Sequence, residues 1–203
     1  MYNFSKHDIK EHIEKNKTIY LVLLFCFFIG LIAGLIIVIS KASYFGLLNI
    51  KDKNMINIIN GNVSLISDFW DCFLSFMFPL ILIFLFSLNY YLSFVNFVIF
   101  SYQSTLLFLT CMALVESYSF LGFIKMLLLI LPVNILYFLI MAFWLAACAE
   151  KAKISHKYNS FSMGFDYGFK LKVYISLIGV LVLSIVVGFI LPLVLKTAIF
   201  IIF

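Results

Sequence analysis

The sequence contains no arginine and carries little charge of either sign. Only 11% of its 203 residues are charged and 65% are hydrophobic, whereas a soluble domain has about 25% charged residues. So few charged side chains cannot supply the polar surface of an ordinary soluble domain. The composition therefore predicts an all-α, polytopic integral membrane helix bundle.

Motifs for metal, cofactor or covalent chemistry are also missing. The four cysteines lie far apart and form no CxxC pair, so we expect them to act as small hydrophobic residues. His7 and His12 are five residues apart on a leader, which is not the spacing of a helical metal pair, and we read them as surface residues. Phosphate-loop, dinucleotide and nucleophile-elbow patterns are absent. We expect no cofactor, no metal and no enzyme activity.

All basic residues are lysines, and the net charge is +5. These lysines lie beside long apolar runs, which fits anionic lipid headgroups better than a polyanion. We therefore expect membrane lipids as partners, and no nucleic acid.

Long uncharged runs define the predicted spans. One of them, 73–115, is about twice the ~20 residues that cross the hydrocarbon core, and the polar cluster Ser87–Tyr91 divides it. A single membrane domain over 1–203 results, with spans at about 19–40, 69–88, 90–113, 124–148 and 171–192.

Lysine counts predict the orientation of these spans. If the N-terminus is cytoplasmic, that side holds nine lysines and the other side five. Cytoplasmic segments usually carry the excess of lysine. We therefore expect a multi-pass cell-membrane protein with a cytoplasmic N-terminus and an extracytoplasmic C-terminus.

Two segments outside the spans are predicted to be helical. Ser5–Asp8 has capping-box spacing, so a helix is expected to begin there and to continue into the first span. Segment 45–61 places Leu48, Met55 and Ile59 near one face and ends at Asn60–Gly61, a typical helix stop. We expect it to lie on the outer surface as an amphipathic helix.

Charged residues at the outer edge are candidates for partner contacts. Asp68 and Asp71 share one side of a helix beside Trp70, and Glu116 lies in the next outer loop. The paired carboxylates fit acid–base chemistry or a cation site, and equally a solvated flank with an aromatic anchor. The candidate partner-binding residues are Lys51, Asp52, Lys53, Asp68, Asp71 and Glu116.

Small and polar residues inside the spans predict close helix packing. Gly30 and Gly34 form a GxxxG motif, which lets two helix backbones approach. The stretch Ser101–Thr105 at mid-span either joins helices by hydrogen bonds or lines a substrate path. No ionisable residue lies near the middle of a predicted span, which disfavours an ion-coupled transporter. The candidate structural residues are Gly30, Gly34, Gln103, Pro132, Asn134 and Pro192.

Three stretches resemble the bacterial stage II sporulation protein M family. The opening His12–Val38 resembles the family's basic leader and Gly-spaced first span, and Leu131–Asn134 matches its Leu-Pro-x-Asn element. The tail GFILPLVLK, with Pro192, resembles its C-terminal segment. The chain departs from the family at Phe94–Phe100, where a glycine pattern is lost, and at Val187, where the family has a Glu.

The resemblance implies a non-enzymatic membrane scaffold. It would anchor or recruit peptidoglycan-degrading enzymes at the septal membrane during engulfment, so its partners would be extracytoplasmic cell-wall hydrolases. A homo-oligomer is a further option. The alternative function is a permease-type membrane subunit of a transporter, with a polar path from Tyr102 to Thr105.

Overall fold

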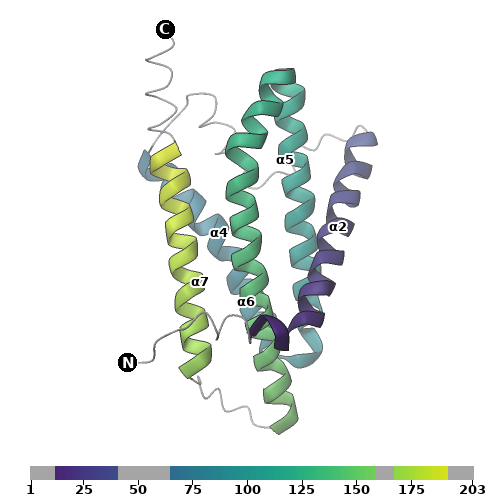
Figure 1. Cartoon of the computed structure of the whole chain (residues 1–203), viewed down its shortest axis with the longest axis vertical. Coiled ribbons are helices and arrows are strands. Elements are labelled where there is room, and N and C mark those ends of the chain that lie inside the picture. The colour runs from purple at the N-terminus through teal and green to yellow at the C-terminus, as the bar shows by residue number, and fades with distance from the viewer. Residues whose placement is uncertain (1–11, 41–64, 159–166, 192–203) are drawn as a thin grey trace.

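The computed structural model describes residues 12–40, 65–158 and 167–191. Five long helices make up this part of the chain (Figure 1). They are α2 (Lys17–Ile39), α4 (Leu65–Ser87), α5 (Val95–Lys125), α6 (Leu131–Tyr158) and α7 (Tyr167–Ile185), with a 3-10 turn η2 (Tyr90–Leu92) and two π-helical turns, η3 (Met126–Ile130) and η4 (Val186–Ile190).

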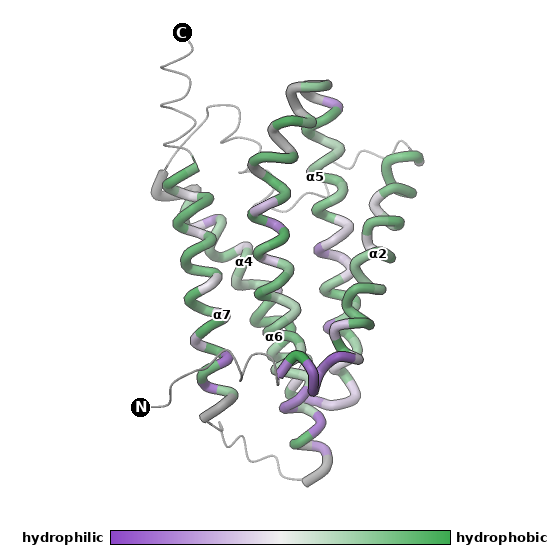
Figure 2. The backbone as a smooth tube through the Cα atoms, in the orientation of Figure 1, coloured by the Kyte–Doolittle hydropathy of each residue, from purple (hydrophilic) through white to green (hydrophobic). Residues whose placement is uncertain are grey.

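Each long helix is apolar enough to cross a membrane. The apolar spans are Lys17–Ile39, Phe69–Ser87, Tyr90–Glu116, Leu131–Ile154 and Phe169–Ile190. Figure 2 shows hydrophobic residues along the whole length of the helices, and hydrophilic ones gathered at the end where α2 begins. The prediction of an all-α bundle with five membrane-spanning helices is confirmed.

Successive helices run in opposite directions (Figure 1). The end of the bundle where α2 and α7 begin and α6 finishes is called the basic end below. Helix α2 packs chiefly on α5, whereas α4, α6 and α7 pack on one another. The most deeply buried side chains of this three-helix core include Phe76, Tyr137, Met141 and Val180.

The segment between the third and fourth spans differs from the prediction. A loop was expected around Glu116, yet the chain is helical without interruption from Val95 to Tyr158 and reverses direction through helical turns (Figure 1). The sequence offers little to stop α5 there, because the first proline after it is Pro132.

The leader does not run into the first span as one helix within the described residues. A single helical turn, residues 12–15, is followed by a turn at Asn16, with φ −107° and ψ 17°, before α2 begins. The Asn16 amide donates to the backbone oxygen of His12 at 3.0 Å, which is the kind of local bond that competes with a continuing helix. Ser5–Asp8, segment 45–61 and Pro192 lie outside the described residues.

Candidate functional site

The GxxxG motif and the polar stretch of the third span meet where α2 packs on α5. Ser104 Oγ donates to the backbone oxygen of Phe27 at 3.0 Å, and Thr105 Oγ1 donates to that of Gly30 at 2.9 Å. A Cβ atom on Gly30 would lie only 1.8 Å from Ser104 Oγ. The absence of a side chain at Gly30 is therefore what brings the two helices within hydrogen-bonding reach.

Gly34 extends the same contact by one turn. A Cβ atom there would lie 2.9 Å from the Cβ of Phe108 on α5. Both glycines thus face α5, and the hydroxyls of Ser104 and Thr105 are used to join α5 to α2.

Gln103 and Tyr102 lie on another side of α5. They line an open groove of about 680 Å³ between α4 and α5, together with Ser75 and Pro79 of α4. Gln103 is buried and Tyr102 is half exposed. Of the stretch from 101 to 105, only Tyr102 and Gln103 line the groove, and with Ser75 they supply its polar part.

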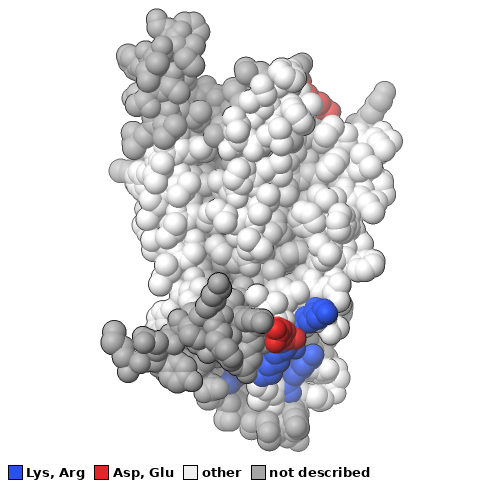
Figure 3. All heavy atoms as spheres, in the orientation of Figure 1, with Lys and Arg blue, Asp and Glu red and all other residues white. Residues whose placement is uncertain are grey.

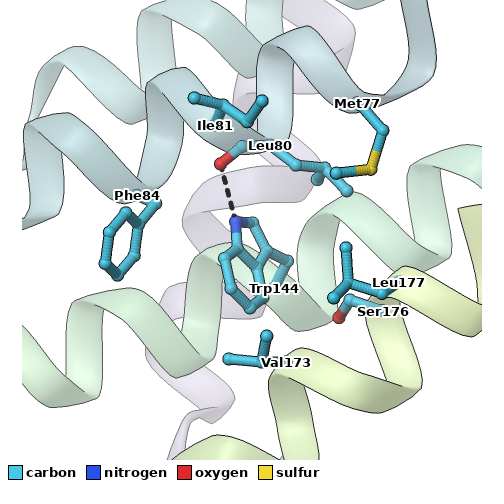
Figure 4. Close-up of a pocket in the computed structure, with 8 residues that line it drawn as sticks. All are labelled: Met77, Leu80, Ile81, Phe84, Trp144, Val173, Ser176 and Leu177. Atoms are coloured by element: carbon cyan, nitrogen blue, oxygen red, sulfur yellow. Dashed lines mark hydrogen bonds between the residues drawn. The ribbon is translucent and has the colours of Figure 1, made fainter. Parts of the chain in front are cut away.

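A second set of bonds joins α6 to α4. Trp144 Nε1 donates to the backbone oxygen of Leu80 at 2.9 Å, and the Tyr137 hydroxyl donates to that of Phe76 at 3.2 Å. In Figure 4 the indole lies beside a cavity of about 200 Å³ between α4, α6 and α7, with its N–H directed at Leu80. The sequence analysis missed both residues.

A signal for this pair does exist in the sequence. Tyr137 and Trp144 are seven residues apart, so they share a helix face, and each carries a donor that needs a partner inside a membrane. Helix α4 also contains Pro79. Because proline lacks a backbone N–H, the ladder of backbone hydrogen bonds in α4 is interrupted at Pro79.

Pro132 and Asn134 occupy the start of α6, directly after the π-helical turn η3. The Asn134 amide donates to the backbone oxygen of Ile130 at 3.0 Å, and the side chain is almost completely buried. Pro132 is exposed. The proline therefore lies at the point where the winding changes, and the amide bonds to the carbonyl four residues before it.

The basic end contains a charged cluster that the sequence analysis also missed. Glu150 of α6 accepts a bond from Lys172 Nζ of α7 at 2.9 Å and one from Lys15 Nζ at 2.5 Å. His12 Nδ1 lies 3.6 Å from the same carboxylate. One carboxylate thus links the leader turn, α6 and α7.

His12 is buried, which corrects the expectation of a surface histidine. Only 7% of it is exposed, and its ring centroid lies 5.1 Å from that of Phe143. Among the described residues, its Nε2 has no hydrogen-bond partner. The Asn16 amide lies 3.1 Å from its Nδ1. Burial, with smaller contributions from Lys172 and Lys15 that outweigh Glu150, lowers the pKa of His12 to about 4. The imidazole is therefore neutral at pH 7.

The candidate partner-binding residues are only partly described. Asp71 is half-buried on α4 and Glu116 is exposed on α5, and both have polar or electrostatic partners. Asp68 lies in α4, and Lys51, Asp52 and Lys53 lie outside the described residues. In Figure 3 one acidic side chain lies at the end opposite the lysines.

Several of the polar groups described above join helices. Ser104, Thr105, Tyr137 and Trp144 donate to backbone carbonyls of a neighbouring helix, and Glu150 accepts from two lysines. Over residues 12–40, 65–158 and 167–191, no three His, Cys, Asp or Glu side chains are grouped as a metal site would require.

Comparison of the chain with family profiles, with characterised proteins and with solved structures yields no match. The resemblance to the stage II sporulation protein M family therefore stays a prediction.

Proposed function

We propose that this multi-pass membrane protein is a non-enzymatic scaffold that recruits peptidoglycan-degrading enzymes, as the resemblance to stage II sporulation protein M implies. The observation that supports it best is the use made of polar side chains inside the spans. Ser104, Thr105, Tyr137 and Trp144 all donate to backbone carbonyls of a neighbouring helix. Such bonds fix helices in register, which is what a platform for partners requires.

The charged cluster fits the same function. Glu150 is held between two ammonium groups and beside a neutral imidazole. A carboxylate stabilised in this way is a poor general base, because paired cations favour its charged form. Its role in a scaffold is to tie the leader turn to α6 and α7.

A permease-type subunit is the second candidate, and one observation favours it. Tyr102 and Gln103 bring polar atoms to the open groove between α4 and α5. Ser104 and Thr105 of the same stretch are bonded to α2. With Ser75, the groove therefore offers three polar residues, where a substrate path would use a continuous row.

The scaffold requires its partner-binding surface to face the cell wall. We place the basic end in the cytoplasm, because cytoplasmic segments carry the excess of lysine. In a Cys-free background, single cysteines at 55 and 118 are then labelled from outside, and one at 155 only after permeabilisation. Labelling of position 155 in intact cells contradicts this orientation.

The function is tested by the position of wall hydrolases in the native host. Deleting the gene should release fluorescently tagged hydrolases from the septal membrane, and wild-type protein should restore them. Replacing Lys51, Asp52 and Lys53 with alanine should lower crosslinking to the hydrolases several-fold at constant membrane level. Lys170→Gln, an exposed position at the basic end, serves as the comparison. Hydrolases that keep their septal position after deletion refute the scaffold.

A further inference from the structure

The largest groove described here runs between α2, α5 and α6. Its volume is about 910 Å³, and its lining is almost entirely apolar. On α2 it is lined by Tyr20, Leu24, Phe27 and Leu31, which recur at helical spacing and form one face. This face of α2, which is turned toward α5 and α6, is thus one wall of an open apolar groove.

The groove has walls of unequal length. It extends over twelve residues of α2, from Tyr20 to Leu31, over twelve of α6, from Leu131 to Ala142, and along α5 from Phe100 to Phe123. At 1.5 Å per residue the α2 and α6 walls are about 16 Å long, roughly half of the ~30 Å hydrocarbon core, whereas the α5 wall is about 35 Å long. An acyl chain that enters from the basic end fits along the part that α2 and α6 line.

The groove leads toward the basic end. Tyr20 lines it and lies with its ring centroid 6.4 Å from that of His12. Ala142, at the last groove position on α6, precedes Phe143, which contacts the same imidazole. The apolar groove is therefore continuous with the charged cluster around Glu150.

Two lysines lie beyond the end of the groove, on the faces of α2 and α6 that line it. Lys17 lies three residues before Tyr20, and Lys153 lies eleven residues after Ala142, so helical periodicity places each on the face that lines the groove. Both are exposed. Within the described part of the chain neither has an ion pair, whereas Lys15 and Lys172 each form an ion pair with Glu150.

The surrounding charge also favours an anion. The basic end holds seven lysines within the described ranges (15, 17, 151, 153, 157, 170 and 172) against two acids, Glu14 and Glu150. Figure 3 shows lysine side chains gathered at this end of the visible face. A phosphate at this level would meet cations, while its attached chains would lie against apolar side chains.

We propose that this groove is a binding site for one anionic phospholipid, with its acyl chains along α2 and α6 and its phosphate beside Lys17 and Lys153. The site is independent of the scaffold function, because it lies on the membrane-facing side of the bundle. Charge complementarity at the basic end distinguishes this occupant from a helix of a second copy.

The test uses the full chain in nanodiscs of phosphatidylglycerol and phosphatidylcholine with identical acyl chains at equal amounts. After transfer into mild detergent, native mass spectrometry counts the lipids that stay bound. The wild type should retain phosphatidylglycerol preferentially. Lys17→Gln and Lys153→Gln should each lower the ratio of bound phosphatidylglycerol to phosphatidylcholine roughly fivefold, the factor that about 1 kcal/mol per cation gives.

Matched variants separate the site from general effects of charge and bulk. Lys170→Gln removes an exposed lysine from α7 and should leave the ratio unchanged, as should the charge-preserving Lys17→Arg. Ile135→Trp fills the groove and should lower retention of both lipids, whereas Ile178→Trp, on the exposed face of α7, should not. Equal retention of the two lipids, or equal effects of the three Lys→Gln variants, overturns the proposal. So does a bound second copy that Ile135→Trp displaces.

Discussion

Replacing Gly30 with alanine should separate α2 from α5. The new Cβ atom would lie 1.8 Å from Ser104 Oγ and 2.2 Å from the backbone oxygen of Ser101. The hydroxyl can rotate away, but the carbonyl belongs to the α5 backbone and moves only with the helix. The two helices must therefore shift apart, and the bonds from Ser104 to Phe27 and from Thr105 to Gly30 are lost together.

The expected loss of stability follows from these contacts. Overpacking a tight contact costs about 1–3 kcal/mol, and each interhelical bond in a membrane contributes about 0.6 kcal/mol. The total is about 2–4 kcal/mol, before a gain of up to about 1 kcal/mol in helix propensity from alanine. The net loss is about 1–4 kcal/mol, which at 2–4 °C for each kcal/mol corresponds to a midpoint lowered by roughly 2–16 °C.

Gly179→Ala is the matched control for this prediction. Its Cβ atom would meet only the side chain of Ile140, with Cδ1 at 2.8 Å and Cγ1 at 3.2 Å. No backbone atom is within reach, and Cδ1 is the far end of a flexible side chain. The propensity gain is the same in both variants, so their difference isolates the contact between α2 and α5. Thermal unfolding in detergent, followed by far-UV circular dichroism, measures both midpoints. Equal midpoints would refute the argument that backbone proximity at Gly30 holds the two helices together.

Three further predictions concern other contacts. His12 has a pKa of about 4 in the folded chain and 6.5 in an unfolded one, so the unfolded state binds protons more tightly between these values. Stability should therefore fall as the pH drops from 6.5 to 4. His12→Gln should remove that part of the pH dependence of unfolding. A wild-type unfolding midpoint that does not change over this pH range contradicts the argument that His12 is buried in the neutral form. Asn134→Leu should destabilise the bundle by about 1–2 kcal/mol in the same assay, because it removes the amide that bonds to Ile130; an unchanged midpoint makes the amide incidental. Trp144→Phe should cost about 1 kcal/mol through its lost bond to α4, whereas Trp70→Phe, at an exposed position, should cost less; equal losses would show that the indole bond contributes nothing.

The fold was predictable because a membrane imposes simple length and polarity rules on helices. Runs of about 20 apolar residues give spans, and the polar break at Ser87–Tyr91 separates α4 from α5 as expected. The contact between α2 and α5 could be predicted only in part from the sequence. Spacing identified Gly30 and Gly34 as a packing face and 101–105 as a bonding stretch, but no pattern indicated that the two would meet.

The cluster at Glu150 could not be predicted from hydropathy. Glu150 lies two residues beyond the predicted end of the fourth span, and at such a position hydropathy predicts no partner for a charged residue. Its partners come from a leader turn and from α7, 135 and 22 residues away in the chain. Only the packing of three segments brings them together. The burial of His12 has the same origin, because Phe143 and Tyr20 cover it from α6 and α2.

Helix α2 is consequently attached in two physically different ways. At mid-span it is held by backbone proximity at Gly30 and Gly34, which ionic strength and pH leave almost untouched. The turn before it is held by the ion pair of Lys15 with Glu150, which salt screens, and by the buried neutral His12, which protonation at low pH disturbs. Because the mid-span contact is independent of the charged one, conditions that loosen the leader turn leave α2 on α5. The basic end is therefore the part of the bundle that responds to its surroundings, while the contact between α2 and α5 keeps the helices in register.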